Sequence, residues 1–139
     1  MRKRTKSREC ALHLLYAYDI HKHNIEQIVE NYWYSNPEQN DVKEFTDILI
    51  NGVITNLAQI DHCIRKYADN WKIERMAVID RNVMRIALYE ILFMESVPVK
   101  VSINEAVDMA KKYGDADSGG FVNGVLDKIN KTEVRDSKK

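Results

Sequence analysis

The chain has few of the residues that build disulfide frameworks, metal sites or membrane spans. Its two cysteines, Cys10 and Cys63, lie far apart among 139 residues in no ligand-like spacing. This excludes a disulfide framework and favours a reducing, intracellular setting. The longest apolar run, residues 86–94, is interrupted by Glu90 and is too short to cross a bilayer. No signal-peptide pattern opens the sequence, so we expect a cytoplasmic protein with no membrane partner.

A catalytic or cofactor-binding pattern is also missing. His13 follows Cys10 by three residues, but no orienting third group or oxyanion motif accompanies them. A partly buried pair is therefore favoured over a nucleophile with its base. His21 and His23 are two residues apart, point away from each other on a helix and make a poor metal pair. The glycines form no phosphate-binding loop. We predict no enzyme activity, no cofactor and no metal.

Strand-like alternation of apolar and polar residues is absent too. The chain is 45% hydrophobic and 30% charged, and at 139 residues it is long enough to bury the core of one domain. Apolar residues recur at helical spacing along most of it. The sequence therefore predicts one all-α domain over residues 1–139, with about six to seven helices.

The charge is unevenly distributed, although the formal net charge is zero. The first eight residues carry five cations and no acid, and they form a basic arm (residues 1–8). Such a segment buries too little apolar surface to order itself, so we expect its first turns to be frayed until an anion neutralises them. A merely solvated surface segment is the alternative interpretation.

Four helices are predicted ahead of residue 98, over about residues 5–22, 25–33, 41–68 and 81–95. Gly52 within the long helix costs about 1 kcal/mol against alanine, which favours close approach of another helix there, with a kink as the alternative. Residues 71–80 are interpreted as a connector with a short helical turn, with Asp80 as the next N-cap. The segment 81–95 is apolar nearly all round and is the predicted core helix.

Glu90 interrupts this core helix, and a buried carboxylate must be paired or hydrogen-bonded. A general acid is one interpretation. A structural role is favoured, either fixing the connection over residues 96–101 or meeting a basic side chain, because no second catalytic group lies near it in sequence.

Two further helices are predicted after Pro98. Ser102 and Glu105 have capping-box spacing, which predicts a helix that starts at Ser102, and Gly114 is expected to end it in a left-handed conformation. Asp117 or Ser118 is expected to cap the last helix, whose apolar stripe runs to residue 129. A polar tail over residues 131–139 is expected to fray.

Five blocks of sequence carry a resemblance to a known family. They are Arg8-Glu9-Cys10-Ala11 with Leu15-Tyr16, then Gly52-Val53, residues 85–90, residues 103–106 with Ala110-Lys111, and residues 121–127. In order and spacing they resemble the NusB family over nearly the whole chain. The resemblance implies a compact helical fold of two packed bundles. It also implies a non-catalytic transcription antitermination factor that binds boxA-type RNA of ribosomal RNA leader transcripts with the ribosomal protein NusE, in an RNA polymerase-associated complex. Self-association in the absence of the partner is a further expectation.

Site residues follow from the same resemblance, position by position. Tyr16 and Asp80 match positions near the NusE contact. At Gly119-Gly120 the sequence departs from the basic or polar residues expected in the family. The RNA-binding positions lie in the arm and after residue 112, and they are Arg2, Lys3, Arg4, Arg8, Tyr113, Asp117, Ser118, Phe121 and Asn123.

Elementary chemistry agrees with these assignments. Arm cations bind phosphates with little sequence information, whereas Phe121 can stack on an unpaired base and Asn123 or Asp117 can recognise its edge. We expect the RNA to meet these three residues beside the arm. The alternatives are a structural adaptor that binds a protein through a helix face, and the NusB-like accessory domain of some ribosomal RNA methyltransferases, although no methyltransferase domain follows.

Overall fold

The computed structural model describes residues 2–22, 24–69, 72–134 and 138, and over these residues it contains helices and no strand. His23, Trp71 and most of the predicted tail beyond residue 134 lie outside the described residues. The elements are α1 (Lys3–His21), α2 (Ile25–Ser35), α3 (Asn40–Thr55), α4 (Leu57–Tyr67), the 3₁₀ turn η1 (Ile73–Arg75), α5 (Val78–Phe93), α6 (Val99–Tyr113) and α7 (Ser118–Glu133). The predicted all-α class is confirmed.

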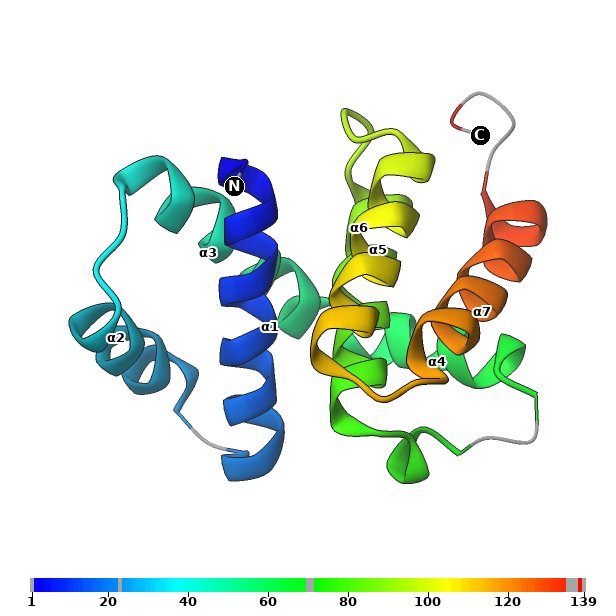
Figure 1. Cartoon of the computed structure of the whole chain (residues 1–139), viewed down its shortest axis with the longest axis horizontal. Coiled ribbons are helices and arrows are strands. Elements are labelled where there is room, and N and C mark those ends of the chain that lie inside the picture. The colour runs from blue at the N-terminus through cyan, green and yellow to red at the C-terminus, as the bar shows by residue number, and fades with distance from the viewer. Residues whose placement is uncertain (1, 23, 70–71, 135–137, 139) are drawn as a thin grey trace.

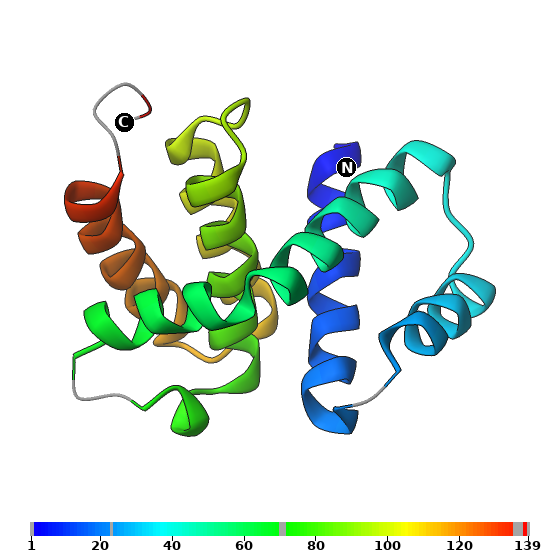
Figure 2. The same cartoon turned by 180° about the vertical axis from the view of Figure 1, so that it is seen from behind.

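The helices form two groups (Figure 1). One contains α1, α2 and the first part of α3, and the other contains α4, α5, α6 and α7. Helices α3 and α4 follow one another diagonally across both groups (Figure 2), and α1 and α3 both pack on α5. The two packed bundles implied by the family resemblance are therefore present, and α5 lies where they meet.

Helix α5 is the core helix, as predicted. It packs against α1, α3, α4, α6 and α7, and its Met84 and Leu88 have no exposed surface. It starts at Val78, three residues earlier than the pattern indicated, so Asp80 lies inside its first turn and is not the N-cap. Asp80 itself is 7% exposed.

The single helix predicted over residues 41–68 is interrupted at Asn56, and this prediction was wrong in that respect. Asn56 has φ −108° and ψ 19°, and its backbone N–H and its side-chain Nδ2 both donate to the Gly52 carbonyl, at 3.1 and 2.8 Å. A short amide side chain that competes for a backbone acceptor disfavours the helix interior. Apolar periodicity continued through this position and could not reveal the break.

Gly52 is required by the close approach of another helix. A Cβ atom at this position would lie 2.1 Å from Cζ of Tyr89 on α5, whose ring stacks in turn on Phe93 at 5.7 Å between centroids. The interpretation of Gly52 as a contact point is confirmed, and the interruption lies four residues later, at Asn56.

Two predicted caps around α6 were wrong. The helix starts at Val99, directly after Pro98, and Ser102 is a buried interior residue. Gly114 has φ −96° and ψ −162°, so it is extended and not left-handed. Glycine is needed there because a Cβ atom would lie 2.4 Å from Oγ of Ser118.

The last helix and the first both extend beyond their predicted ends. Helix α7 reaches Glu133, and Val134 is buried at 8% exposure, so the chain remains packed past residue 131. Helix α1 begins at Lys3, so the arm is helical and not frayed. Within the described part of the chain, no helix is long and apolar enough to span a bilayer.

Two glycine substitutions test the α3–α5 contact. We expect Gly52→Ala to lower the free energy of unfolding, because overpacking against Tyr89, at about 1–3 kcal/mol, outweighs the gain in helix propensity. Gly124→Ala is the matched control, since no atom lies within 4 Å of its added Cβ on α7, and it should raise stability by about 0.5–1 kcal/mol. Urea denaturation of both variants measures the contrast, and equal effects would contradict the assigned contact.

Candidate nucleic-acid interface

Arg8 fixes the arm to the rest of the molecule. Its Nε and Nη2 donate to the two carboxylate oxygens of Glu90 on α5, both at 2.8 Å, and its Nη1 donates to Oε1 of Glu105 on α6 at 2.8 Å. Ser102 Oγ also donates to Glu90, at 2.9 Å. Burial alone would lower the pKa of Arg8, but these carboxylates raise it. The predicted structural role of Glu90 is confirmed.

This placement changes the interpretation of Arg8. Its side chain is 4% exposed, and the donors just described already meet carboxylate oxygens. A phosphate could reach the guanidinium only by breaking a buried ion pair, which costs several kcal/mol. We therefore assign Arg8 to holding the arm in place and remove it from the predicted phosphate contacts.

The other arm cations lie at the surface. Lys3 Nζ is 2.6 Å from Oδ2 of Asp41, and the guanidinium of Arg4 lies over the ring of Phe45 at 4.4 Å. These carboxylate and ring contacts supply the charge compensation that the arm was expected to need from an external anion. They explain why the arm is helical. Water and salt screen such exposed pairs, so an RNA phosphate can compete for Lys3.

A groove of about 810 Å³ lies beside the arm. One wall is the first turn of α1, with Arg2, Lys3 and Arg4, all exposed. The opposite wall is the start of α6, with Pro98, Val101, Asn104 and Asp108. We call this feature the arm groove. Its three exposed cations make it the most suitable place in the described chain for a nucleic-acid backbone.

The predicted RNA residues after position 112 divide into two kinds. Tyr113 donates its hydroxyl to Glu9 at 3.0 Å, and the buried Ser118 accepts the N–H of Asp115 at 3.0 Å. Both side chains thus stabilise the fold locally. Asp117 and Asn123 are exposed and Phe121 is half-buried, so these three side chains remain accessible, Asp117 in the turn between α6 and α7 and the other two at the start of α7.

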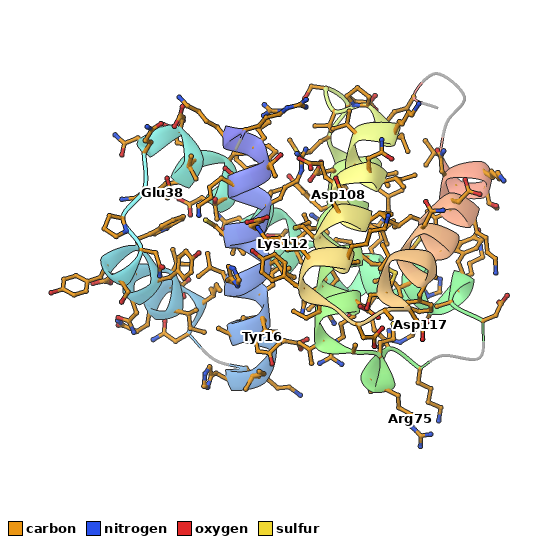
Figure 3. The ribbon with its side chains drawn as sticks, viewed as in Figure 1. Tyr16, Glu38, Arg75, Asp108, Lys112 and Asp117 are labelled. Carbon is orange, nitrogen blue, oxygen red and sulfur yellow. The ribbon has the colours of Figure 1, made fainter. Side chains whose placement is uncertain are left out.

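The arm and this turn do not lie beside one another, and that prediction was wrong. Helices α1 and α6 run in the same direction, so the arm meets the start of α6, whereas the turn follows its end (Figure 1). Figure 3 accordingly places Asp117 far from the N-terminus, with Lys112 between the two regions. Helix α6 has 15 residues and is about 22 Å long. The sequence places Asp117 only four residues after Tyr113, and this gave no information on how far the turn lies from the arm.

A second pocket, of about 450 Å³, lies at the turn and contains Asp80, Asp117 and Phe121. Asp80 Oδ1 is buried without a hydrogen-bond partner, and burial together with the nearby Asp115 raises the pKa of the Asp80 carboxyl. The structure therefore brings a predicted partner-binding residue together with two predicted RNA-binding residues. Tyr16, 40% exposed on α1, lies toward the same end of the molecule (Figure 3).

Comparison with known proteins agrees with this architecture. The family model described as NusB family matches residues 5–131. The chain belongs to the NusB family. The transcription antitermination protein NusB of Thermodesulfovibrio yellowstonii is 42% identical over 142 residues, which cover 95% of this chain and 94% of that protein. That of Anaeromyxobacter sp. is 45% identical over 128 residues, covering 91% and 89%.

Solved NusB structures superpose over almost the whole chain. NusB of T. maritima has a TM-score of 0.87 at 34% identity and covers 99% of this chain and 96% of its own. A crystal structure of the antitermination factors NusB and NusE in complex with dsRNA gives a TM-score of 0.85 at 30% identity, covering 94% and 98%. The predicted family resemblance is confirmed.

A second buried ion cluster of this NusB-family chain was missed by the sequence analysis. Asp19 Oδ2 accepts from Arg81 Nε at 2.6 Å and from Asn82 Nδ2 at 3.1 Å, which joins α1 to α5. Arg85 adds a bidentate pair with Asp61 of α4, at 2.8 and 2.9 Å. The partners lie far apart in sequence, and the available signal was two cations, Arg81 and Arg85, within an apolar helix.

The surroundings of the two free cysteines disfavour the reactive thiolate form. Cys10 and Cys63 are both buried, and burial raises the pKa of the Cys63 thiol to about 11. A thiol with a raised pKa is a poor nucleophile and a poor metal ligand. Among the described residues, no group of three or more His, Cys, Asp or Glu side chains is placed to hold a metal ion.

The buried and exposed arm contacts should differ in their contribution to stability. Arg8→Ala leaves Glu90 buried without its cation, so we expect a loss of about 3–5 kcal/mol in the free energy of unfolding. Lys3→Ala, the control, removes a cation that is 63% exposed and should leave stability nearly unchanged. Thermal and urea denaturation measure both, and a small loss for Arg8→Ala would refute its assigned role.

Two aspartates should respond to pH in opposite directions. Burial favours the neutral form of Asp19, but hydrogen bonds from Arg81 and Asn82 and the Arg85 charge outweigh it and lower its pKa. Asp19 therefore stabilises the fold above its unfolded pKa of about 4, and this stabilisation is lost as the pH falls through its folded pKa. The raised pKa of Asp80 means that its carboxylate costs stability at neutral pH and less on acidification.

Asparagine variants at these positions measure the two contributions. At pH 7, Asp19→Asn should lower the free energy of unfolding by about 2 kcal/mol, because charge-assisted hydrogen bonds are weakened. Asp80→Asn should raise it. Both differences should shrink as the pH falls toward 3. Urea denaturation between pH 3 and 8 gives the curves, and differences of the same sign would contradict the two assigned environments.

Proposed function

We propose that this protein is a non-catalytic transcription antitermination factor. It binds single-stranded boxA-type RNA of ribosomal RNA leader transcripts together with the ribosomal protein NusE, within an RNA polymerase-associated complex in the cytoplasm. Membership of the NusB family supports this function. The observation that carries the RNA part is the arm groove, where Arg2, Lys3 and Arg4 remain exposed while Arg8 holds their helix against α5 and α6.

The RNA backbone lies against the arm and the strand continues toward the turn between α6 and α7. Lys112, half-exposed and paired with Glu9 at 3.0 Å, lies between these regions and offers a further cation along the way (Figure 3). At the far end, Phe121 stacks on an unpaired base, and Asp117 or Asn123 accepts or donates at its edge. Tyr113 and Ser118 stabilise the fold around this surface through their hydrogen bonds to Glu9 and Asp115.

The partner surface lies at the end of α1 opposite the arm. Tyr16 and Ile20 are 40% and 52% exposed there, and NusE binds to this surface together with Asp80. Exposed aromatic and aliphatic side chains of this kind are typical of protein contacts. When NusE is absent, the same apolar residues are available for self-association.

The salt dependence of RNA binding tests the arm. Replacing both Arg2 and Arg4 by Gln should weaken binding to every RNA, and the slope of log affinity against log salt should fall by about 0.7 for each phosphate that the protein no longer binds. Lys128→Gln, which alters an exposed cation on α7, is the matched control. Fluorescence anisotropy with boxA-type RNA, with and without NusE, provides the measurement.

An unchanged salt slope and a complete absence of RNA binding have different consequences. An unchanged slope in the doubly substituted protein would refute phosphate binding by the arm. If the unaltered protein binds no RNA under either condition, the RNA function itself fails and a protein-binding adaptor is favoured.

A further inference from the structure

The wall of the arm groove opposite the arm carries a stripe of side chains that no part of the proposed function has used. Val101, Asn104 and Asp108 follow at i, i+3 and i+7 on α6, so they share one face of the helix. All three line the groove and all are exposed. The core residues of α6, such as Ala106 and Ala110, lie on a different face.

Three other polar residues of the groove, Thr5, Arg8 and Glu105, are already engaged with one another or with Glu90. Thr5 donates to Glu105 Oε1, and Arg8 Nη1 donates to the same oxygen. The Glu105 charge is thereby compensated and opposes an incoming phosphate less. The side chains of Asn104 and Asp108, by contrast, form no hydrogen bond or ion pair with any described residue. Because both residues line the groove, these side chains are available to a molecule bound there.

The two walls suit the two sides of a nucleic-acid strand. In the proposed function phosphates meet Arg2, Lys3 and Arg4 on α1, which leaves the opposite wall on α6 to the bases of the same strand. Val101, 41% exposed, provides an apolar contact for a base face, and the Asn104 amide presents a donor and an acceptor side by side. An Asn amide pairs well with an amino group next to a ring nitrogen, as on adenine.

We propose that Asn104 is a specificity-determining residue that recognises one unpaired base of the RNA held in the arm groove. The neighbouring Asp108 carboxylate accepts hydrogen bonds only, so it favours a base with an exocyclic amino group and disfavours a carbonyl edge. The preferred base at this position is therefore one with an exocyclic amino group, adenine, cytosine or guanine, rather than uracil. This inference rests on the proposed function, because the arm must first hold the RNA backbone.

Affinity measurements on a base-substituted RNA series test the inference. A boxA-type single strand carries each of the four bases in turn at every position, and fluorescence anisotropy gives the affinities for the unaltered protein and for Asn104→Ala. The unaltered protein should show one position where a base with an exocyclic amino group binds at least about 5-fold more tightly than uracil. Asn104→Ala should reduce that ratio below about 2-fold. Preferences elsewhere, the salt slope and the melting temperature should not change.

Asn51→Ala is the matched control, since Asn51 is an exposed amide on α3 outside the groove, and it should leave the whole profile unchanged. An unaltered profile in Asn104→Ala, or no preference for an amino-bearing base over uracil at any position, would overturn the inference while leaving RNA binding intact. Failure of the unaltered protein to bind any RNA of the series, with or without NusE, would overturn the proposed function as well.

Discussion

The buried contact between Arg8 and Glu90 determines how the two helix bundles are joined at the arm. Glu90 lies in the core helix and is 1% exposed, and a buried carboxylate without a cation at hydrogen-bonding distance would destabilise the fold by several kcal/mol. Arg8 supplies that cation from α1, and Ser102 and Glu105 complete the cluster from α6. Three helices are thereby fixed relative to one another. The arm groove is a direct consequence, because its two walls are the first turns of α1 and α6.

Much of this fold could be predicted from local patterns. Periodicity gave the helical class and the core helix, Gly52 indicated a close helix contact, and Glu90 indicated a buried partner. The identity of that partner could not be predicted, because Arg8 lies 82 residues away in sequence and resembles the arm cations around it. Ser102 and Glu105 had the spacing of a cap, but their side chains meet Glu90 and Arg8 in the buried cluster, so tertiary contacts override the local pattern.

The candidate site was predictable in its residue types and less so in its geometry. The exposed arm cations, Phe121 and Asn123 are accessible, as phosphate and base contacts require. Their separation depends on the parallel direction of α1 and α6, which no sequence motif encodes. The same holds for the pocket that unites Asp80 with Phe121, and for the Asp19 cluster. The proposed RNA path therefore runs along the length of α6 and does not meet one compact surface.

Arg8, buried in its ion pair with Glu90, is expected to position the arm without binding phosphate. The most direct test is the salt dependence of RNA binding by the doubly substituted protein Arg8→Met with Glu90→Leu. Apolar side chains of similar volume replace the ion pair there, so the fold should be retained, which circular dichroism checks. The slope of log affinity against log salt should equal that of the unaltered protein. A decrease of about 0.7 or more would show that Arg8 contacts a phosphate, contrary to its assignment to the buried ion pair.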